Sequence, residues 1–309
     1  MDINKYKQVV SEFIRDVKYF DINVGIKRAV CTFNDNKQKY LIRRNDAFVM
    51  YLEKRFRDLL DTYKSCNEDL LSDNEGPIWV FWWQGMEKMP PLIEACLKSK
   101  LRYAKDRNVI VLDKNNVFEY VKLSDEVCQA FVSGKIKIQH FADIVRVNLI
   151  NQHGGLWLDA SIFCSSSIPD YCFKYSFFSL KGNPDYDYVS ENKWTTFVIG
   201  GSKNNALCAF LSDFFDVYIK TNKPFIDYFM FDCAIELAYR NIPLIKNEID
   251  NLPKYENDCY WLSNNLKSKF KDIKVVMNQY KMPFNKLAWK QDINDLKSVY
   301  VAIEKGELL

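Results

Sequence analysis

The first 70 residues carry apolar side chains at the spacing of helices. Five of them recur so that they share one helical face: Val9, Val10, Phe13, Ile14 and Val17. A second helix is predicted over 46–65, and the polar run at 72–77 is typical of a turn. The pattern therefore predicts a helical N-terminal extension over 1–75, followed by a main domain over 76–309.

From residue 76 onward, short apolar runs alternate with longer amphipathic ones. Strands are predicted at 78–83, 108–113 and 156–163, with helices between them at 90–105 and 135–155. The second of these helices is closed by Gly154–Gly155, a common C-terminal stop. Repeated strand–helix–strand units predict an α/β fold in which helices flank a mainly parallel sheet with right-handed crossovers.

Beyond residue 165 the pattern is less regular. The elements predicted there are strands at 176–182 and 195–201, helices at 204–220 and 225–240, and, within 273–290, one further strand and an aromatic, basic loop. The chain shows no internal repeat and no linker, which favours a single domain behind the extension.

Polar residues and a glycine follow the three predicted parallel strands. Ligands of such sheets bind beyond the carboxyl ends of the strands. Gly85, Asp113 and Asp159 each end or follow one of these strands. We therefore expect these three residues to line one edge of the sheet.

Composition narrows the class of protein. Hydrophobic residues make up 48% and charged residues 27%, which is ordinary for a soluble globular protein. The net charge of +3 arises from interleaved charges of both signs, so nucleic acid is not an expected partner. Basic clusters at Lys27–Arg28, Arg43–Arg44 and 98–107 are interpreted either as solvated surface or as weak contact with an anionic membrane.

Several features predict a cytoplasmic location. The nine cysteines are scattered without a C-x-x-C pair, which is typical of a reducing compartment. Residues 1–10 lack the apolar core of a signal peptide, and the longest apolar run, 78–83, is too short to span a bilayer. The hypothesis is a cytoplasmic protein, with peripheral contact at the inner membrane face left open.

Common catalytic motifs are absent. The chain has no G-x-G-x-x-G after a strand, no Walker loop and no G-x-S-x-G elbow. The two histidines, His140 and His153, form no H-E-x-x-H motif. The sequence therefore argues against a dinucleotide-binding protein, a serine hydrolase and a zinc hydrolase.

One segment, 141–163, concentrates the chemistry. Asp143 and Arg146 lie three residues apart and share a helix face. They are interpreted either as a surface ion pair or as a pair that faces the protein body, because Ile150 lies on the same side of the helix. Asp159 follows a buried strand, where a charge is costly without a partner, a metal or a ligand. The plainer interpretation of Asp159 is a cap for a nearby loop.

This segment resembles the signature of retaining glycosyltransferases of the GT-A fold. It is most similar to family 32 and the capsular polysaccharide synthesis proteins, and more distantly to the glucosylating clostridial toxins. Their pattern, S/A-D-x-x-R and then G-G-[IL]-[YW]-x-D-x-D, reads here as Ala142-Asp143, Arg146, Gly154-Gly155, Leu156-Trp157, Asp159 and Ser161. Weaker likeness extends to 78–85, to Phe231–Asp232 and to 285–290.

The resemblance implies a GT-A-like fold and a retaining hexosyltransferase. It would move a sugar from a nucleotide-diphosphate donor, expected to be a UDP-sugar, to a saccharide or lipid-linked acceptor in bacterial surface polysaccharide synthesis. Asp159 and Asp232 would be catalytic, with Asp232 meeting an acceptor hydroxyl. The donor-binding residues implied are Asp143, Arg146, Trp157, Trp82, Trp83, Gln84, Gly85, Lys286, Trp289 and Lys290.

Each of these roles has a plainer structural alternative. Trp157 is equally expected to pack within its strand, and one of Trp82 and Trp83 is expected to belong to the hydrophobic core. Asp232, in an otherwise apolar helix, is either hydrogen-bonded internally or directed at a ligand. The basic residues at 286–290 are also consistent with an ordinary charged tail.

Ser161 stands where the family has the last Asp of its D-x-D motif. Asp159 and Ser161 would hold a divalent cation, Mn²⁺ or Mg²⁺, but a hydroxyl is a poorer ligand than a carboxylate. A rival hypothesis is therefore a non-catalytic sugar- or nucleotide-binding protein on a degenerate scaffold. A third, a glycoside hydrolase using Asp159 and Asp232, leaves the Asp-x-x-Arg helix and the Gly-Gly turn unexplained.

Overall fold

The structure is a computed structural model that describes residues 3–33, 37–66, 74–185, 187–277, 280 and 282–308. Its strands are β1 (Ile78–Phe81), β2 (Val109–Leu112), β3 (Gly155–Leu158), β4 (Ile162–Cys164), β5 (Phe177–Ser179), β6 (Val198–Gly201) and β7 (Phe284–Lys286). Its helices are α1 (Ile3–Tyr19), α2 (Ile22–Phe33), α3 (Lys37–Arg55), α4 (Arg57–Tyr63), α5 (Pro91–Tyr103), α6 (Val117–Tyr120), α7 (Asp125–Val132), α8 (Ile138–His153), α9 (Ala206–Lys220), α10 (Met230–Asn241), α11 (Pro243–Asp250), α12 (Trp261–Asn264), α13 (Phe270–Met277) and α14 (Val299–Glu304), with 3-10 turns η1 (Met86–Lys88) and η2 (Asp170–Phe173).

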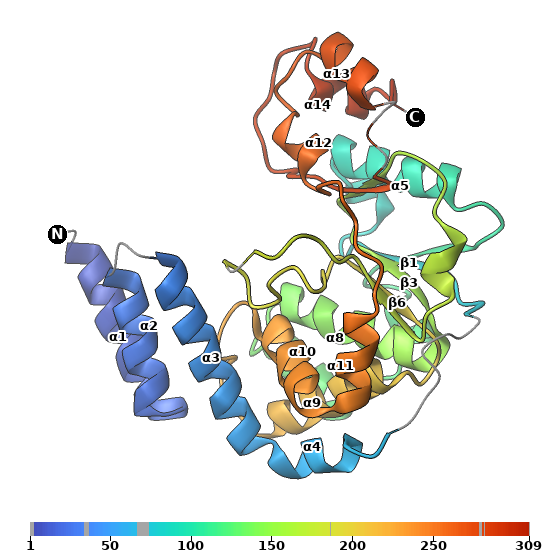
Figure 1. Ribbon diagram of the computed structural model, residues 1–309. Coiled ribbons are helices and arrows are strands. Elements are labelled where there is room, and N and C mark those ends of the chain that lie inside the picture. Colours follow the sequence, from blue (N-terminus) through green and yellow to red (C-terminus); the bar gives the residue numbers. More distant parts are fainter. Residues whose placement is uncertain are drawn as a thin grey trace.

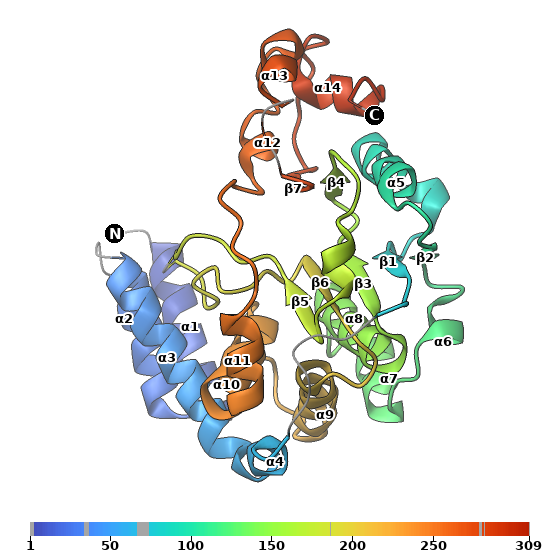
Figure 2. The same ribbon diagram turned by 45° about the vertical axis from the view of Figure 1, so that its right-hand side comes forward.

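A five-stranded sheet forms the centre, in the order β2-β1-β3-β6-β5. Strand β1 pairs in parallel with β2 and β3, while β6 runs antiparallel to β3 and β5. Four of the five strands therefore point the same way. Helix α8 packs against β3 and β6, and α9 packs against α8 (Figure 2). The expected α/β fold, with helices flanking a mainly parallel sheet, is confirmed.

The predicted strand at 156–163 is wrong in its extent. Strand β3 ends at Leu158, and β4 begins only at Ile162. The amide of Ile162 donates to the carbonyl of Asp159 at 2.9 Å, so residues 159–161 form a turn between the two strands. Asp159 therefore lies just beyond the end of β3.

The glycine pair before β3 is required by its backbone. Gly154 and Gly155 have φ of 69° and 108°, which other residues rarely adopt. The Asn74 side chain lies against them, accepting from the Gly155 amide at 2.8 Å and donating to the Gly201 carbonyl. A Cβ on Gly155 would lie 2.3 Å from the carbonyl oxygen of Pro77. The predicted tight turn between α8 and β3 is confirmed.

The C-terminal part departs most from its prediction. Residues 270–277 form helix α13 where the tail had been assigned only a strand and a loop, although the predicted strand does exist as β7. Within the predicted segment, residues 278, 279 and 281 lie outside the described residues. Helix 225–240 also begins later than predicted, at Met230. Strand β7 pairs with β4, so it joins the last helices to the turn at 159–161 (Figure 2).

The N-terminal extension is helical as predicted. The helix expected at 46–65 is divided at Phe56 into α3 and α4, and residues 72 and 73 of the predicted turn lie outside the described residues. Helix α3 packs against α10, and α1 and α2 lie outside it at the edge of the molecule (Figure 1). Phe48 and Leu52 of α3 belong to the same hydrophobic core as the sheet.

Two general features of the chain complete the picture. All nine cysteines lie among the described residues, and all are free thiols. Among the described residues, no helix combines the length and apolar composition needed to cross a bilayer.

Candidate active site

A cavity of about 680 Å³ opens beyond the carboxyl ends of β1 and β3. Its walls come from the segment after β1, from α8, from the turn after β3, from the start of α10 and from the segment around β7. Twelve of the thirteen residues selected from the sequence line it: Trp82, Trp83, Gln84, Asp143, Arg146, Trp157, Asp159, Ser161, Asp232, Lys286, Trp289 and Lys290. The fold thus brings together residues more than 200 positions apart.

Helix α8 supplies Asp143 and Arg146. Arg146 Nη2 lies 3.2 Å from Asp143 Oδ1, and Nη1 donates to the carbonyl of Thr196. The guanidinium lies over the rings of Trp157 and Phe231, with its central carbon 5.0 and 5.3 Å from their centroids. The Arg146 side chain is only 7% exposed, so this is not a surface ion pair.

Asp159 sits where two cations converge. Lys286 Nζ lies 2.7 Å from its Oδ2, Arg146 Nη2 lies 3.4 Å from its Oδ1, and Trp157 Nε1 donates to Oδ1 at 2.8 Å. Burial by itself would raise the pKa of Asp159. The charges of Lys286 and Arg146 and the two hydrogen bonds outweigh burial and hold the pKa below its ordinary value. Asp159 is therefore ionised at neutral pH.

A buried lysine supports the turn at 159–161. Lys100 of α5 is fully buried, and its Nζ donates to the carbonyls of Ala160 at 3.0 Å and Ile162 at 2.6 Å. Burial lowers the pKa of Lys100. The interpretation of residues 98–107 as solvated surface is wrong for this lysine, because its amine is used to fix the backbone beside Asp159.

Strand β7 delivers the basic residues from the C-terminal side. Lys286 pairs in register with Ile162, which places its amine beside Asp159. The loop that follows carries Trp289 and Lys290 to the cavity wall, with Lys290 Nζ 5.0 Å from the Trp289 ring centroid. The basic residues predicted at this end are therefore part of the cavity and not a separate tail.

The two tryptophans after β1 differ in their surroundings. Trp83 packs edge-on against Phe131 and Phe141 and so extends the core. Trp82 packs edge-on against Trp289, with ring centroids 5.6 Å apart, and its buried Nε1 has no hydrogen-bond partner among the described residues. The expectation that one of the two is core is consistent with Trp83, whereas Trp82 contributes with Trp289 to the aromatic wall of the cavity.

Two residues expected at this edge do not line the cavity. Gly85 forms the turn before η1 with a φ of 93°, and its amide donates to the Trp82 carbonyl. Asp113 accepts from the amides of Asn115 and Asn116 and caps its own loop. Both lie at the same edge of the sheet as Asp159, as expected, but each turns the backbone after its strand. The donor-binding role of Gly85 stays a prediction.

Asp232 lies in the first turn of α10. Its Oδ1 accepts from Trp194 Nε1 at 3.0 Å. Burial raises the pKa of Asp232 to about 7, and the neighbouring charge of Asp143 adds to that rise. Asp232 is therefore bonded internally and also lines the cavity, with a carboxyl that exchanges its proton near neutral pH. Its contact with a ligand stays a prediction.

Sequence reasoning missed much of one wall. The loop between β5 and β6, the segment before α10 and the segment before α12 add further lining residues: Tyr188, Val189, Ser190, Asn192, Trp194, Thr195, Thr196, Phe197, Tyr228, Phe229 and Tyr260. The loop has no apolar period to mark it. Tyr228 and Phe229 were placed inside the helix predicted at 225–240 and not at its entrance.

Comparison with known proteins identifies the family. The family model for capsular polysaccharide synthesis protein matches residues 28–304, nearly the whole chain. The chain belongs to this family. The resemblance of residues 141–163 to this family is thus confirmed, and the match extends into the N-terminal helices.

Two proteins found by comparison, one by sequence and one by structure, are glycosyltransferases by name. The O-glycosyltransferase braB of Annulohypoxylon truncatum is 28% identical over 132 residues, which is 40% of this chain but only 31% of that protein. The PaToxG glycosyltransferase structure aligns with 67% of this chain and 83% of its own, at 14% identity and a TM-score of 0.36. The chain thus spans about a third of the length of the first of these proteins.

Proposed function

We propose that this protein transfers a sugar from a nucleotide-diphosphate donor to a saccharide acceptor. The observation that carries the proposal is the charge arrangement in the cavity. An ionised Asp159 lies between Lys286 and Arg146, and Asp232, with a pKa of about 7, lines the same cavity. A diphosphate leaving group needs cations, and an acceptor hydroxyl needs a group that can take its proton.

The donor would lie along the wall formed by the ends of β1, β3 and β7. The edge-on pair Trp82 and Trp289 offers aromatic surface for the base, and Lys286 and Lys290 offer positive charge for the diphosphate. Asp143 and Arg146 would bind hydroxyls of the sugar, because their polar atoms meet beside Asp159. A UDP-sugar is the donor we propose first, on the family likeness.

The transfer step needs one bond exchanged for another. The bond between the anomeric carbon and the diphosphate oxygen breaks and its electron pair leaves on the diphosphate, while the acceptor oxygen bonds to the anomeric carbon. The acceptor proton passes to Asp232 or to the departing phosphate oxygen. Retention of configuration, proposed from the family likeness, would place both oxygens on the same face of the sugar.

A divalent cation fits the site only in part. Asp159 and Ser161 are the protein oxygens that would hold Mg²⁺ or Mn²⁺, and the described residues contain no group of three or more His, Cys, Asp or Glu suited to a metal. Such ions commonly take their remaining ligands from water and substrate phosphates. We therefore propose a cation that binds with the donor, where it would neutralise charge on the leaving diphosphate.

A second cavity suggests a place for the acceptor. It has a volume of about 510 Å³ and shares four lining residues with the first: Tyr188, Asn192, Thr195 and Tyr260. Its other walls carry carboxylates, amides and the ring of Tyr255, which suit hydrogen bonding and stacking to a sugar. We assign the saccharide end of the acceptor, free or lipid-linked, to this cavity.

The proposal is tested with purified protein and a panel of nucleotide sugars, with and without Mn²⁺. The expected result is a raised melting temperature with one donor and release of its free nucleotide. Asp159→Asn should abolish release, whereas Asp170→Asn, which removes an exposed Asp–Lys pair at the surface, should not. Stabilisation by the donor without nucleotide release would instead support the non-catalytic sugar- or nucleotide-binding alternative.

One observation also suits a glycoside hydrolase. Asp159 has a lowered pKa and Asp232 a raised one, as in a pair that divides the nucleophile and acid roles. A hydrolase would cleave aryl glycosides without any nucleotide, and a transferase would not. Nucleotide-free cleavage would therefore replace the transferase proposal.

A further inference from the structure

The outer face of the N-terminal hairpin, α1 and α2, is apolar and open. Nine large hydrophobic side chains on these two helices are between 36% and 69% exposed: Ile3, Tyr6, Val10, Ile14, Val17, Ile22, Ile26, Val30 and Phe33. They include three of the five residues that mark the predicted helix face; of the other two, Val9 is buried and Phe13 is half-buried. An exposed apolar surface of this kind marks a binding face.

The exposed side chains form one stripe on each helix. Along α1 and along α2 they recur every three or four residues, so each set lies on a single side. The stripes adjoin where Gly25 of α2 lies against Phe13 and Val17 of α1. Lys5 Nζ, 5.9 Å from the Phe33 ring centroid, ties the beginning of α1 to the end of α2. We call these nine side chains the hairpin face.

Positive charge accompanies the hairpin face. Lys7 and Lys18 follow Ile3 and Ile14 by four residues, so they lie beside the stripe of α1. Glu12 lies two residues from both Val10 and Ile14 and so points to the opposite side. Residues 1–55 contain twelve Lys and Arg against seven Asp and Glu, a net charge of +5, whereas the rest of the chain is net −2.

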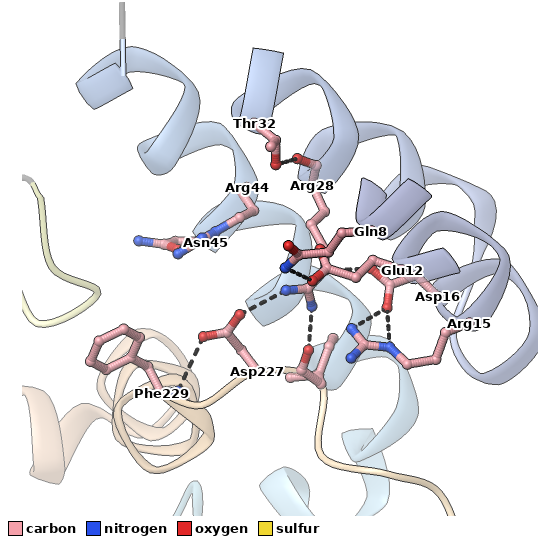
Figure 3. Close-up of polar contacts among 11 residues, drawn as sticks. Gln8, Glu12, Arg15, Asp16, Arg28, Thr32, Arg44, Asn45, Asp227 and Phe229 are labelled. Carbon is pink, nitrogen blue, oxygen red and sulfur yellow. Dashed lines mark hydrogen bonds and ion pairs between the residues drawn. The ribbon is translucent and has the colours of Figure 1, made fainter. Parts of the chain in front are cut away.

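The remaining charges of the hairpin are used to hold it in place. Arg28 lies 2.5 Å from Asp16 of α1 and 2.8 Å from Asp227 before α10, and it also donates to the Ile226 carbonyl (Figure 3). Asp16 is fully buried, so the interpretation of Arg28 as solvated surface is wrong. The two residues after Asp227, Tyr228 and Phe229, line the cavity. The hairpin is therefore anchored to the cavity wall.

We propose that the hairpin face inserts into the surface of an anionic lipid bilayer, with Lys7 and Lys18 among the headgroups. Apolar side chains flanked by lysines on a helix lying flat match the chemistry of such a surface. A second copy of the chain fits less well, because a two-fold contact would bring the lysines of both hairpins together. The inference deepens the proposed function, because a lipid-linked acceptor would be presented at the same surface.

Vesicle flotation tests the proposal with the full chain. Wild type should bind vesicles containing about 30% phosphatidylglycerol at least tenfold better than pure phosphatidylcholine vesicles, and high salt should remove most of that preference. Ile14→Glu combined with Ile26→Glu should lower binding at least about tenfold. Lys7→Glu combined with Lys18→Glu should remove the preference for anionic vesicles.

The matched control places glutamates on other exposed apolar positions. Val132→Glu with Leu296→Glu, at residues 88% and 75% exposed outside the hairpin, should bind vesicles as wild type does. Equal binding of all variants, or no binding by wild type, would overturn the proposal. So would a dimer, seen by light scattering, that the Ile14 and Ile26 variant abolishes.

Vesicle binding requires neither nucleotide nor sugar. Failure of this test would therefore leave the proposed sugar transfer intact, and a protein without transferase activity could still bind vesicles. Nucleotide release measured on the same variants with a soluble acceptor should match wild type, because no substituted residue lines the cavity.

Discussion

Two arginines in this protein have nearly the same partners and different surroundings. Arg28 contacts Asp16, Asp227 and the carbonyl of Ile226. Arg146 contacts Asp143, Asp159 and the carbonyl of Thr196. Each guanidinium also lies over an aromatic ring, that of Phe48 for Arg28 and that of Trp157 for Arg146. The chemical groups therefore do not distinguish the two clusters.

What differs is how the protein covers them. Asp16 is fully buried, so the Arg28 cluster is closed and joins the hairpin to the segment before α10. Asp159 keeps 24% of its side chain exposed to the cavity, and Lys286 approaches it from another element. The same set of charges therefore locks two segments together where it is enclosed and forms a candidate site where a cavity remains. A charged motif in a sequence does not reveal which of the two it will become.

The carboxylates of the two clusters give the largest contrast. Asp159→Asn should lower nucleotide release about 10³-fold, because the charge that organises Lys286 and Arg146 is lost. Its melting temperature should fall by less than about 3 °C, since both cations still face a cavity. Turnover and thermal melting measured on one preparation decide this, and wild-type activity in the variant would refute the assignment.

Arg28→Met should show the opposite pattern. Removing the guanidinium leaves Asp16 buried with Arg15 as its one remaining ionic partner among the described residues, which should cost about 3 kcal/mol of unfolding free energy. Nucleotide affinity should stay within about twofold of wild type at a temperature where the variant is folded. Urea unfolding and calorimetry test the pair of expectations. A stable variant with weakened nucleotide binding would make Arg28 part of the site.

Arg146→Ala should separate the sugar from the nucleotide. If the guanidinium binds sugar hydroxyls, affinity for the nucleotide sugar should fall about tenfold more than affinity for the bare nucleotide. Calorimetry with both ligands measures the difference. Equal losses would mean that Arg146 contacts the nucleotide or that it only holds the fold together, as Arg28 does.

Asp232 should give the cavity a pH dependence. Because the pKa of Asp232 is about 7, the fraction of its carboxyl groups that is ionised and able to accept a proton increases as the pH rises through neutrality. Nucleotide release should therefore rise between pH 6 and 8. A raised pKa means that the folded state holds a proton that the unfolded state has lost, so stability falls as pH rises from about 4 to 7. Asp232→Asn should therefore melt about 5 °C above wild type at pH 8, with the gap closing towards pH 4. A gap independent of pH would remove Asp232 as the titrating group.

Ser161 should produce the smallest effect. With one protein carboxylate, Mn²⁺ should bind weakly to the free protein and clearly once a nucleotide diphosphate is present. Ser161→Asp should raise affinity in the free protein about tenfold, which paramagnetic resonance can measure. Tight binding by the nucleotide-free wild type would contradict a cation brought in with the donor. Full activity in chelator would leave charge neutralisation to Lys286 and Lys290.

The spacing of apolar residues predicted best those helices and strands that are packed against other elements on both faces. Between residues 78 and 158, β1, β2, α5, α8 and the start of β3 were predicted within a few residues, because the strands are short apolar runs bounded by turn residues, whereas the short helices α6 and α7 were not predicted. The tail was harder, since α13 is only eight residues long and mostly exposed. Its weak pattern was read as a strand and loop. The structure of that region depends on an apolar cluster in which residues of α13 and α14 pack around Leu262 and Ile303.

Local patterning could predict the site only where its residues lie close together in the sequence, and the more distant residues, such as Trp82, Asp232 and Lys286, came from the family resemblance. Asp143, Arg146 and Asp159 fall within one patterned segment. By contrast, Trp194 reaches Asp232 across 38 residues, and Lys100 reaches the turn after β3 across about 60, through contacts that no local pattern encodes. Lys100 was taken for surface because its neighbours 98 and 102 are charged, whereas its own helix position faces inward.

The pairing of Ile162 with Lys286 also determines when the cavity is completed during synthesis of the chain. Lys286 follows Asp159 by 127 residues, a delay of roughly 6 to 25 s at ~5–20 residues per second. During that interval the emerging chain contains Asp159 and Arg146 but neither Lys286 nor β7. The lysine that pairs with Asp159 is therefore made well after the two residues it joins in the cavity.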